Sequence, residues 1–151
     1  MTKNKKTDVP AKKAFVEELK TKGFDARITG APADITAVRD GKTWYFEIKM
    51  THRRDTYFGA ATMTEWEQAL KDPDHYRFVA AIADETGSTF EFREFAPAEF
   101  MRFSTIPPLK VYFNLDLAGA RKRKRSASKA TPLTTENFNK LAESYRTLTR
   151  E

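Results

Sequence analysis

Three ionisable residues, Asp34, Glu47 and Lys49, lie on the two sides of a predicted β-hairpin. The dipeptide Asp40-Gly41 between them is a strong signal for a tight hairpin turn. Counting outward from a two-residue turn places Asp34 directly opposite Glu47. A four-residue loop centred on the same dipeptide keeps that register, whereas a three-residue loop would destroy it. Because side chains alternate along a strand, Lys49 shares the face of Glu47. The sequence therefore predicts two carboxylates and an ammonium group on one face of the hairpin.

This grouping fits the chemistry of a metal-dependent hydrolase. Carboxylates held roughly 5 Å apart on opposed strands repel each other unless they share a proton or a cation. A hard divalent ion such as Mg²⁺ takes oxygen ligands and keeps water in its remaining positions. An adjacent lysine can orient or deprotonate the attacking water, or neutralise charge that develops on a phosphoryl oxygen. Glu-x-Lys alone also fits an ordinary surface hairpin with a solvated cross-strand ion pair. The register, an apolar opposite face and the flanking helices favour the hydrolytic site over that alternative.

The elements around the hairpin predict an α/β core in which a central mixed sheet is flanked by helices. The first helix begins at Pro10 and ends before Gly23, and the second follows a capping box formed by Thr62 and Glu65 and ends before Pro73. Periodic apolar residues predict the strands and an amphipathic terminal helix. The expected order is helix 10–22, strands 24–29, 34–39 and 42–49, helix 63–72, strands 76–84 and 88–95, helix 96–103, strand 109–117 and helix 133–151.

The stretch Pro32-Ala33-Asp34, followed by a hairpin and then by Glu47-Ile48-Lys49, resembles the motif of the PD-(D/E)XK nuclease superfamily, which has the restriction-endonuclease-like fold. The resemblance extends over residues 10–95, whose helix, three strands, helix and strand follow the order of the superfamily core. It implies that Asp34 and Glu47 are ligands of Mg²⁺ or Mn²⁺, that the carbonyl of Ile48 is a further ligand, and that Lys49 is the catalytic lysine. All three motif residues are present, which favours a working site.

The same resemblance directs attention to two further positions. Many relatives place an acidic residue early in the first helix, where this chain has Lys12 and Lys13. Glu18, farther along the helix, is a weaker candidate to support the metal. Relatives also often place a polar residue on the helix after the site, where it supports the metal or the lysine, and Gln68 is the candidate here. Glu65 lies one turn away from Gln68 and is explained by its capping box.

The net charge of +6 is concentrated in one short segment. Residues 1–120 carry 18 Lys and Arg against 18 Asp and Glu, and residues 131–151 carry three of each, so the whole excess falls within residues 121–130. Arg53 and Arg54 directly follow the site strand and are expected to contact phosphates beside the scissile bond, or else to lie in a solvated loop. A localisation signal or a solvated linker would also explain the basic segment, but a dense run on a neutral body favours contact with the nucleic-acid backbone. The run consists of Arg121, Lys122, Arg123, Lys124 and Arg125.

The expected protein is a cytoplasmic endonuclease that acts on DNA with Mg²⁺ or Mn²⁺. The absence of cysteine excludes disulfides and thiolate metal sites, and neither a signal peptide nor a membrane-spanning apolar run is visible. We expect a nuclease-like domain over residues 10–117, a basic linker over 118–132 and a C-terminal helix over 133–151. That helix packs on its own core or pairs with a second copy, and a homodimer would bring two sites to one duplex. The alternatives are a non-catalytic nucleic-acid- or protein-binding module of the same fold and, if the hairpin register differs, an unrelated α+β domain.

Overall fold

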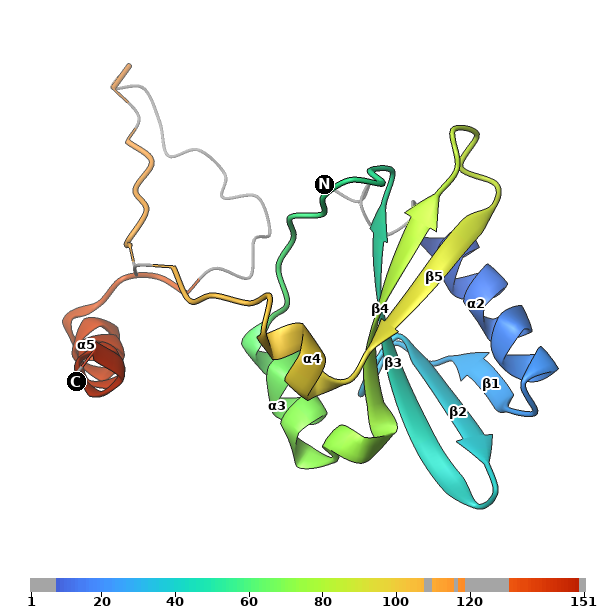
Figure 1. Cartoon of the computed structure of the whole chain (residues 1–151). Coiled ribbons are helices and arrows are strands. Elements are labelled where there is room, and N and C mark those ends of the chain that lie inside the picture. The colour runs from blue at the N-terminus through green and yellow to red at the C-terminus, as the bar shows by residue number, and fades with distance from the viewer. Residues whose placement is uncertain (1–7, 108–109, 116, 119–130, 150–151) are drawn as a thin grey trace. The chain divides into compact units, whose positions relative to one another are not determined.

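The computed structural model describes residues 8–107, 110–115, 117–118 and 131–149. The chain divides into two compact units, residues 1–105 and residues 106–151. The first unit is a mixed α/β fold with a five-stranded, mostly antiparallel open sheet flanked by helices (Figure 1). This architecture agrees with the predicted restriction-endonuclease-like core.

The sheet keeps its strands in chain order. Only β3 and β4 are parallel, and every other pair of neighbours is antiparallel. A parallel pair needs a crossover, which α3 (Met63–Lys71) and the short 3-10 helix η1 (Pro73–His75) supply. The predicted order of helix, three strands, helix and two strands is confirmed. The strands are β1 (Asp25–Ile28), β2 (Ile35–Arg39), β3 (Lys42–Thr51), β4 (Tyr76–Ala83) and β5 (Phe90–Phe95).

The hairpin of β2 and β3 has the predicted register. Arg39 pairs with Lys42 next to the turn, and the same ladder carried outward places Asp34, one residue before β2, opposite Glu47. Both residues of the Asp40-Gly41 turn have positive φ, 52° and 74°. A two-residue type I′ turn requires this left-handed conformation at both central positions, and Asp-Gly adopts it readily. The turn chemistry therefore fixes the pairing that brings the two carboxylates together.

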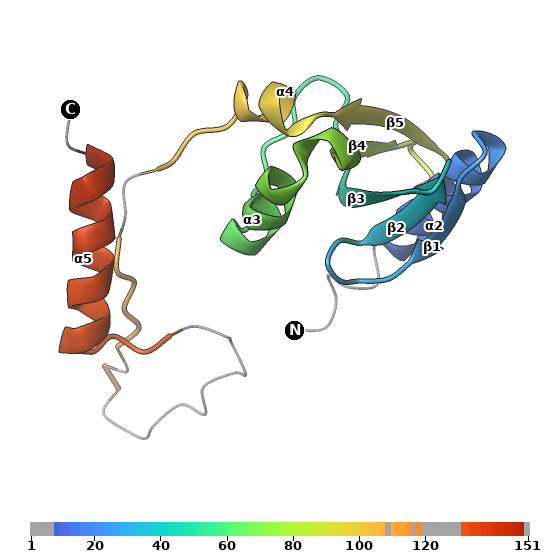
Figure 2. The ribbon, with the colours of Figure 1, turned by 90° about the horizontal axis from the view of Figure 1, so that it is seen from below.

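One face of the sheet packs against α2 (Val9–Thr21), as Figures 1 and 2 show. Phe15 and Leu19 of this helix are buried against Phe46 and Ile48 of β3. Complete burial of a large apolar side chain stabilises a fold by about 1.5–3 kcal/mol, so these contacts decide which face of β3 is turned to α2. The alternate residues of β3, which include the site residues, therefore point to the opposite face.

That opposite face packs against α3 and α4 (Pro97–Met101) (Figures 1 and 2). The rings of Phe78 and Phe100 stack with their centroids 4.3 Å apart, and Trp66 lies 4.9 Å from Phe78. Tyr76 and Ala69 are buried in the same cluster. These contacts fix α3 against β4 and thereby position the N-terminus of α3 near the end of the hairpin.

The second unit contains α5 (Thr135–Thr149), which confirms the predicted terminal helix. The predicted strand over 109–117 was wrong for the part that can be seen, because residues 110–115 form no strand, and Tyr112 and Phe113 are 88% and 84% exposed. An apolar pattern gives a strand only where a neighbouring strand pairs with it, and none of the described strands pairs with residues 110–115. The predicted basic run at 121–125 lies outside the described residues. None of the helices within the described ranges is long and apolar enough to cross a membrane.

Candidate active site

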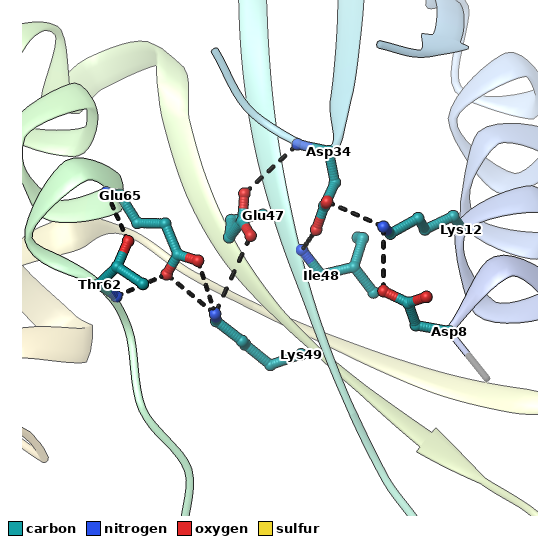
Figure 3. Close-up of polar contacts among 8 residues, drawn as sticks. All are labelled: Asp8, Lys12, Asp34, Glu47, Ile48, Lys49, Thr62 and Glu65. Carbon is teal, nitrogen blue, oxygen red and sulfur yellow. Dashed lines mark hydrogen bonds and ion pairs between the residues drawn. The ribbon is translucent and has the colours of Figure 1, made fainter. Parts of the chain in front are cut away.

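Asp34 and Glu47 face each other at the open end of the hairpin (Figure 3). The backbone N–H of Asp34 donates to Oε2 of Glu47 over 3.3 Å. The carboxylate of Asp34 in turn accepts from the backbone N–H of Ile48, which lies 2.9 Å from Oδ2. Because β2 begins only after Asp34, this side chain supplies the hydrogen bond that a strand backbone would otherwise give to Ile48. The carboxylate pair is therefore part of the end of the sheet ladder.

Lys49 is held on the same face by a carboxylate from α3. Its Nζ lies 3.0 and 2.9 Å from the two carboxylate oxygens of Glu65 and 3.9 Å from Oε1 of Glu47. Glu65 also accepts from the backbone N–H of Thr62, whose hydroxyl accepts from the backbone N–H of Glu65. The predicted capping box is confirmed. Glu65 has a second role that its capping box did not indicate, because it also orients Lys49.

A second lysine reaches the site from α2 (Figure 3). The Nζ of Lys12 lies 2.9 Å from Oδ1 of Asp34 and 2.9 Å from Oδ2 of Asp8, the residue that precedes the helix. The resemblance points to an acidic residue in this region, and the structure places an ammonium group there between two carboxylates. The spacing of Asp8 and Lys12, four residues apart at the start of a helix, indicates the ion pair between these two residues. It does not indicate the contact between Lys12 and Asp34.

A cavity of about 630 Å³ opens beside these residues. Its volume lies within the range of pockets that bind small ligands. Gln68, predicted as a supporting residue, lines this cavity together with both carboxylates and Glu65. Residues 30–32, Thr62 and Thr64 complete the lining. The two predicted carboxylates and the α3 residues Glu65 and Gln68 thus line the same cavity.

One known protein family covers the part of the chain that carries these residues. The family described as Protein NO VEIN, C-terminal, matches residues 9–92. The chain belongs to this family. The match runs from the start of α2 into β5 and includes the whole hairpin and α3. No curated protein and no solved structure matches the chain.

In this NO VEIN C-terminal domain, the pKa of Glu47 is raised to about 8. Burial is the largest cause, since Glu47 is 8% exposed, and the negative charges of Asp34 and Glu65 raise the pKa further while Lys49 opposes them. At neutral pH Glu47 is therefore largely protonated when no metal ion is bound. A divalent ion between the carboxylates would favour the ionised form and would release that proton on binding.

The donor set fits a hard divalent cation. Asp34 and Glu47 supply carboxylate oxygens, the ligands that Mg²⁺ prefers. A strand residue directs its N–H and C=O to the same neighbour, so the carbonyl of Ile48 points to the side on which its N–H meets Asp34. Over the described ranges, no three His, Cys, Asp or Glu side chains gather into a cluster that could hold a metal. With two carboxylates and one carbonyl as protein ligands, an ion at this site would keep water in its remaining positions, as Mg²⁺ commonly does.

The other predicted residues lie away from this cavity. Glu18 forms an ion pair with Lys22 at 3.6 Å and does not line the cavity. Arg54 forms an ion pair with Glu91 of β5 at 3.4 Å, and Arg53 is exposed in the loop after β3. The structure thus brings together the three motif residues and Gln68, and it adds contacts from α2 and α3 to them.

Proposed function

We propose that this chain is a metal-dependent nuclease of the PD-(D/E)XK superfamily that cleaves DNA as an endonuclease. The observation that carries the proposal is the arrangement at the end of the hairpin, where Asp34 lies opposite Glu47 and Lys49 shares the same face. The ion pair between Lys49 and Glu65 supports it further, because both side chains are only 18% exposed and the capping box fixes Glu65, so the ammonium group has a defined direction. The cavity beside these residues leaves room for a phosphodiester group.

In the proposed mechanism, Asp34, Glu47 and the carbonyl of Ile48 would hold Mg²⁺ or Mn²⁺. When bound, such an ion would supply activation of water and neutralisation of charge on the phosphoryl group. Lys49 presents an ammonium group with three N–H donors and no acceptor. Glu65 accepts from this ammonium group and fixes its direction. An N–H of Lys49 that Glu65 does not engage can donate to the attacking water or to a phosphoryl oxygen on which charge develops.

Affinity for DNA is assigned to the basic run at 121–125 and to Arg53. The run at 121–125 carries five positive charges on a chain whose remaining residues are nearly neutral. Such a run binds phosphates through the release of counterions and makes binding strongly dependent on salt. Arg53, exposed directly after the site strand, is the residue to which contact with phosphates beside the scissile bond is assigned.

Plasmid nicking tests the proposal. Wild-type protein should nick supercoiled DNA in Mg²⁺ or Mn²⁺, and EDTA should stop the reaction. Glu47→Gln should abolish nicking, whereas Glu67→Gln, which changes an exposed carboxylate of α3, should leave it unchanged. DNA binding without nicking, unaffected by Mg²⁺ and by Lys49→Ala, would contradict the nuclease and support the non-catalytic binding module.

A further inference from the structure

Both oxygens of Asp34 already have a donor in the free protein. Oδ2 accepts from the backbone N–H of Ile48 at 2.9 Å, and Oδ1 lies 2.9 Å from Nζ of Lys12. The first donor belongs to the backbone of β3 and is fixed by the sheet. The second is the end of a long side chain and can move. A cation that binds Asp34 therefore approaches a carboxylate that Lys12 already neutralises, and the two positive charges compete for it.

Lys12 is held more firmly than a surface lysine. The side chains of Lys12 and Asp34 are only 16% and 15% exposed. Nζ also lies 2.9 Å from Oδ2 of Asp8, one helical turn earlier. Burial lowers the pKa of Lys12, but the hydrogen bonds and charges of Asp34 and Asp8 outweigh burial, so the pKa is raised overall. Lys12 is therefore charged at neutral pH.

We infer that Lys12 is a tethered counter-ion that competes with the divalent cation for Asp34 and so weakens metal binding by the free protein. This inference rests on the proposed metal site. Lys12 can release Asp34 without losing every partner, because Asp8 remains within its reach. Oδ1 of Asp8 is buried and makes no hydrogen bond among the described residues, so Asp8 has unused acceptor capacity for the ammonium group. The start of α2 thus tunes metal affinity at this site.

Calorimetric titration with Mg²⁺, repeated with Mn²⁺, measures the competition without DNA. Lys12→Met should lower the Kd for the metal about ten- to a hundredfold, since a coupling between two cations on one carboxylate is worth that much. Lys12→Arg keeps the ion pair and should bind the metal as wild type does. Lys13→Met removes the same charge from a neighbouring exposed position and should change the Kd by less than about threefold, because surface charges are screened.

Thermal melting checks that the variants fold. Lys12→Met should melt at a lower temperature than wild type in EDTA, because Asp8 and Asp34 lose their shared partner. Mg²⁺ should raise the melting temperature of Lys12→Met by more than it raises that of wild type. The inference is overturned if Lys12→Met lowers the Kd no more than Lys13→Met does, or raises it. Asp34→Asn, alone and combined with Lys12→Met, distinguishes failure of the proposed metal site from failure of the inference about Lys12. Metal binding that disappears with Asp34→Asn keeps the proposed site, whereas binding that survives it overturns both the site and the inference.

Discussion

Glu65 holds Nζ of Lys49 at 2.9 and 3.0 Å with the same carboxylate that closes the capping box of α3. The start of a helix and the end of a central strand are therefore joined by one side chain. Because this carboxylate is also fixed by the backbone N–H of Thr62, it can hold the ammonium group in one direction, which a flexible surface partner could not do. The contact makes α3 part of the proposed catalytic site.

Glu65→Gln should separate the two roles of this residue. The amide oxygen of Gln can still accept from the backbone N–H of Thr62, but the negative charge that orients Lys49 is lost. We expect nicking to slow by about ten- to a hundredfold, the usual cost of removing a partner that orients a site residue. The measurement is the initial rate of plasmid nicking at saturating Mg²⁺.

Thr62→Ala is the matched control for Glu65→Gln. It removes the hydroxyl that accepts from the backbone N–H of Glu65 and should lower the free energy of unfolding by about 1 kcal/mol. Its effect on nicking should be smaller than that of Glu65→Gln, because the carboxylate beside Lys49 remains. Equal loss of rate in both variants would mean that Glu65 acts only through the stability of α3.

Lys49→Met should abolish cleavage while keeping metal binding. Removal of a group that transfers protons or stabilises charge at the reacting atoms commonly costs about 10²–10⁴-fold in rate. Calorimetry should show that Mg²⁺ still binds, since the carboxylates of Asp34 and Glu47 are intact. Lys42→Met, an exposed lysine at the start of the same strand, should leave the rate unchanged. A Lys49→Met protein that still cleaves DNA at the wild-type rate would exclude Lys49 from the mechanism.

The raised pKa of Glu47 predicts how stability depends on pH. Because the folded protein binds this proton more tightly than the unfolded chain, the stabilisation is complete below the unfolded pKa of 4.5 and is lost as the pH rises through about 8. In EDTA, the free energy of unfolding should therefore fall by on the order of 2–4 kcal/mol between pH 5 and pH 8.5. Urea unfolding at several pH values measures the decline.

Two comparisons assign this decline to Glu47. Glu47→Gln should flatten it, whereas Glu67→Gln, an exposed carboxylate on α3, should leave it as in wild type. Saturating Mg²⁺ should also reduce the decline, because the cation stabilises the ionised carboxylate. If wild type and Glu47→Gln lose the same stability with rising pH, the titrating group is not Glu47.

Replacement of the basic run by five Gln residues should weaken DNA binding by the largest factor at low salt and make the remaining binding less dependent on salt. Each phosphate contact adds about 0.9 to the slope of log K against log salt concentration, so loss of all five contacts would reduce the slope by about 4.5. Fluorescence anisotropy with a labelled duplex gives this slope, and nicking at low salt should persist. An unchanged slope would assign the run at 121–125 to a solvated linker or a localisation signal.

The sequence contained most of what positions the carboxylates. Asp40-Gly41 determined the turn type, and the turn determined the register that places Asp34 opposite Glu47. The apolar alternation of β3 determined which face meets α2. These features are local or alternate along one strand, so a pattern in the sequence can specify them. The segment at 110–115 was mispredicted for the complementary reason, because a strand also needs a neighbour.

The ion pairs of the site were less accessible to sequence reasoning. The contact between Lys12 and Asp34 joins α2 to the end of the hairpin, and it depends on how Phe15 and the sheet pack together. The contact between Lys49 and Glu65 depends in the same way on the packing of α3. No spacing within one segment encodes such contacts. The capping box indicated only that Glu65 contacts Thr62, and the spacing of Asp8 and Lys12 indicated only that these two residues pair. Neither pattern indicated the second contact, which Glu65 makes with Lys49 and Lys12 makes with Asp34.

Binding of Mg²⁺ by calorimetry, with Asp34→Asn and Asp40→Asn measured beside the wild type, shows whether Asp34 is part of a metal site. Asp40 is a suitable control because it lies at the tip of the same hairpin, its side chain is 90% exposed, and Asn tolerates its positive φ. We expect wild type and Asp40→Asn to bind Mg²⁺ and Asp34→Asn not to bind it. Equal binding by Asp34→Asn and wild type, or no binding by the wild type and by Lys12→Met, would contradict a metal site at Asp34.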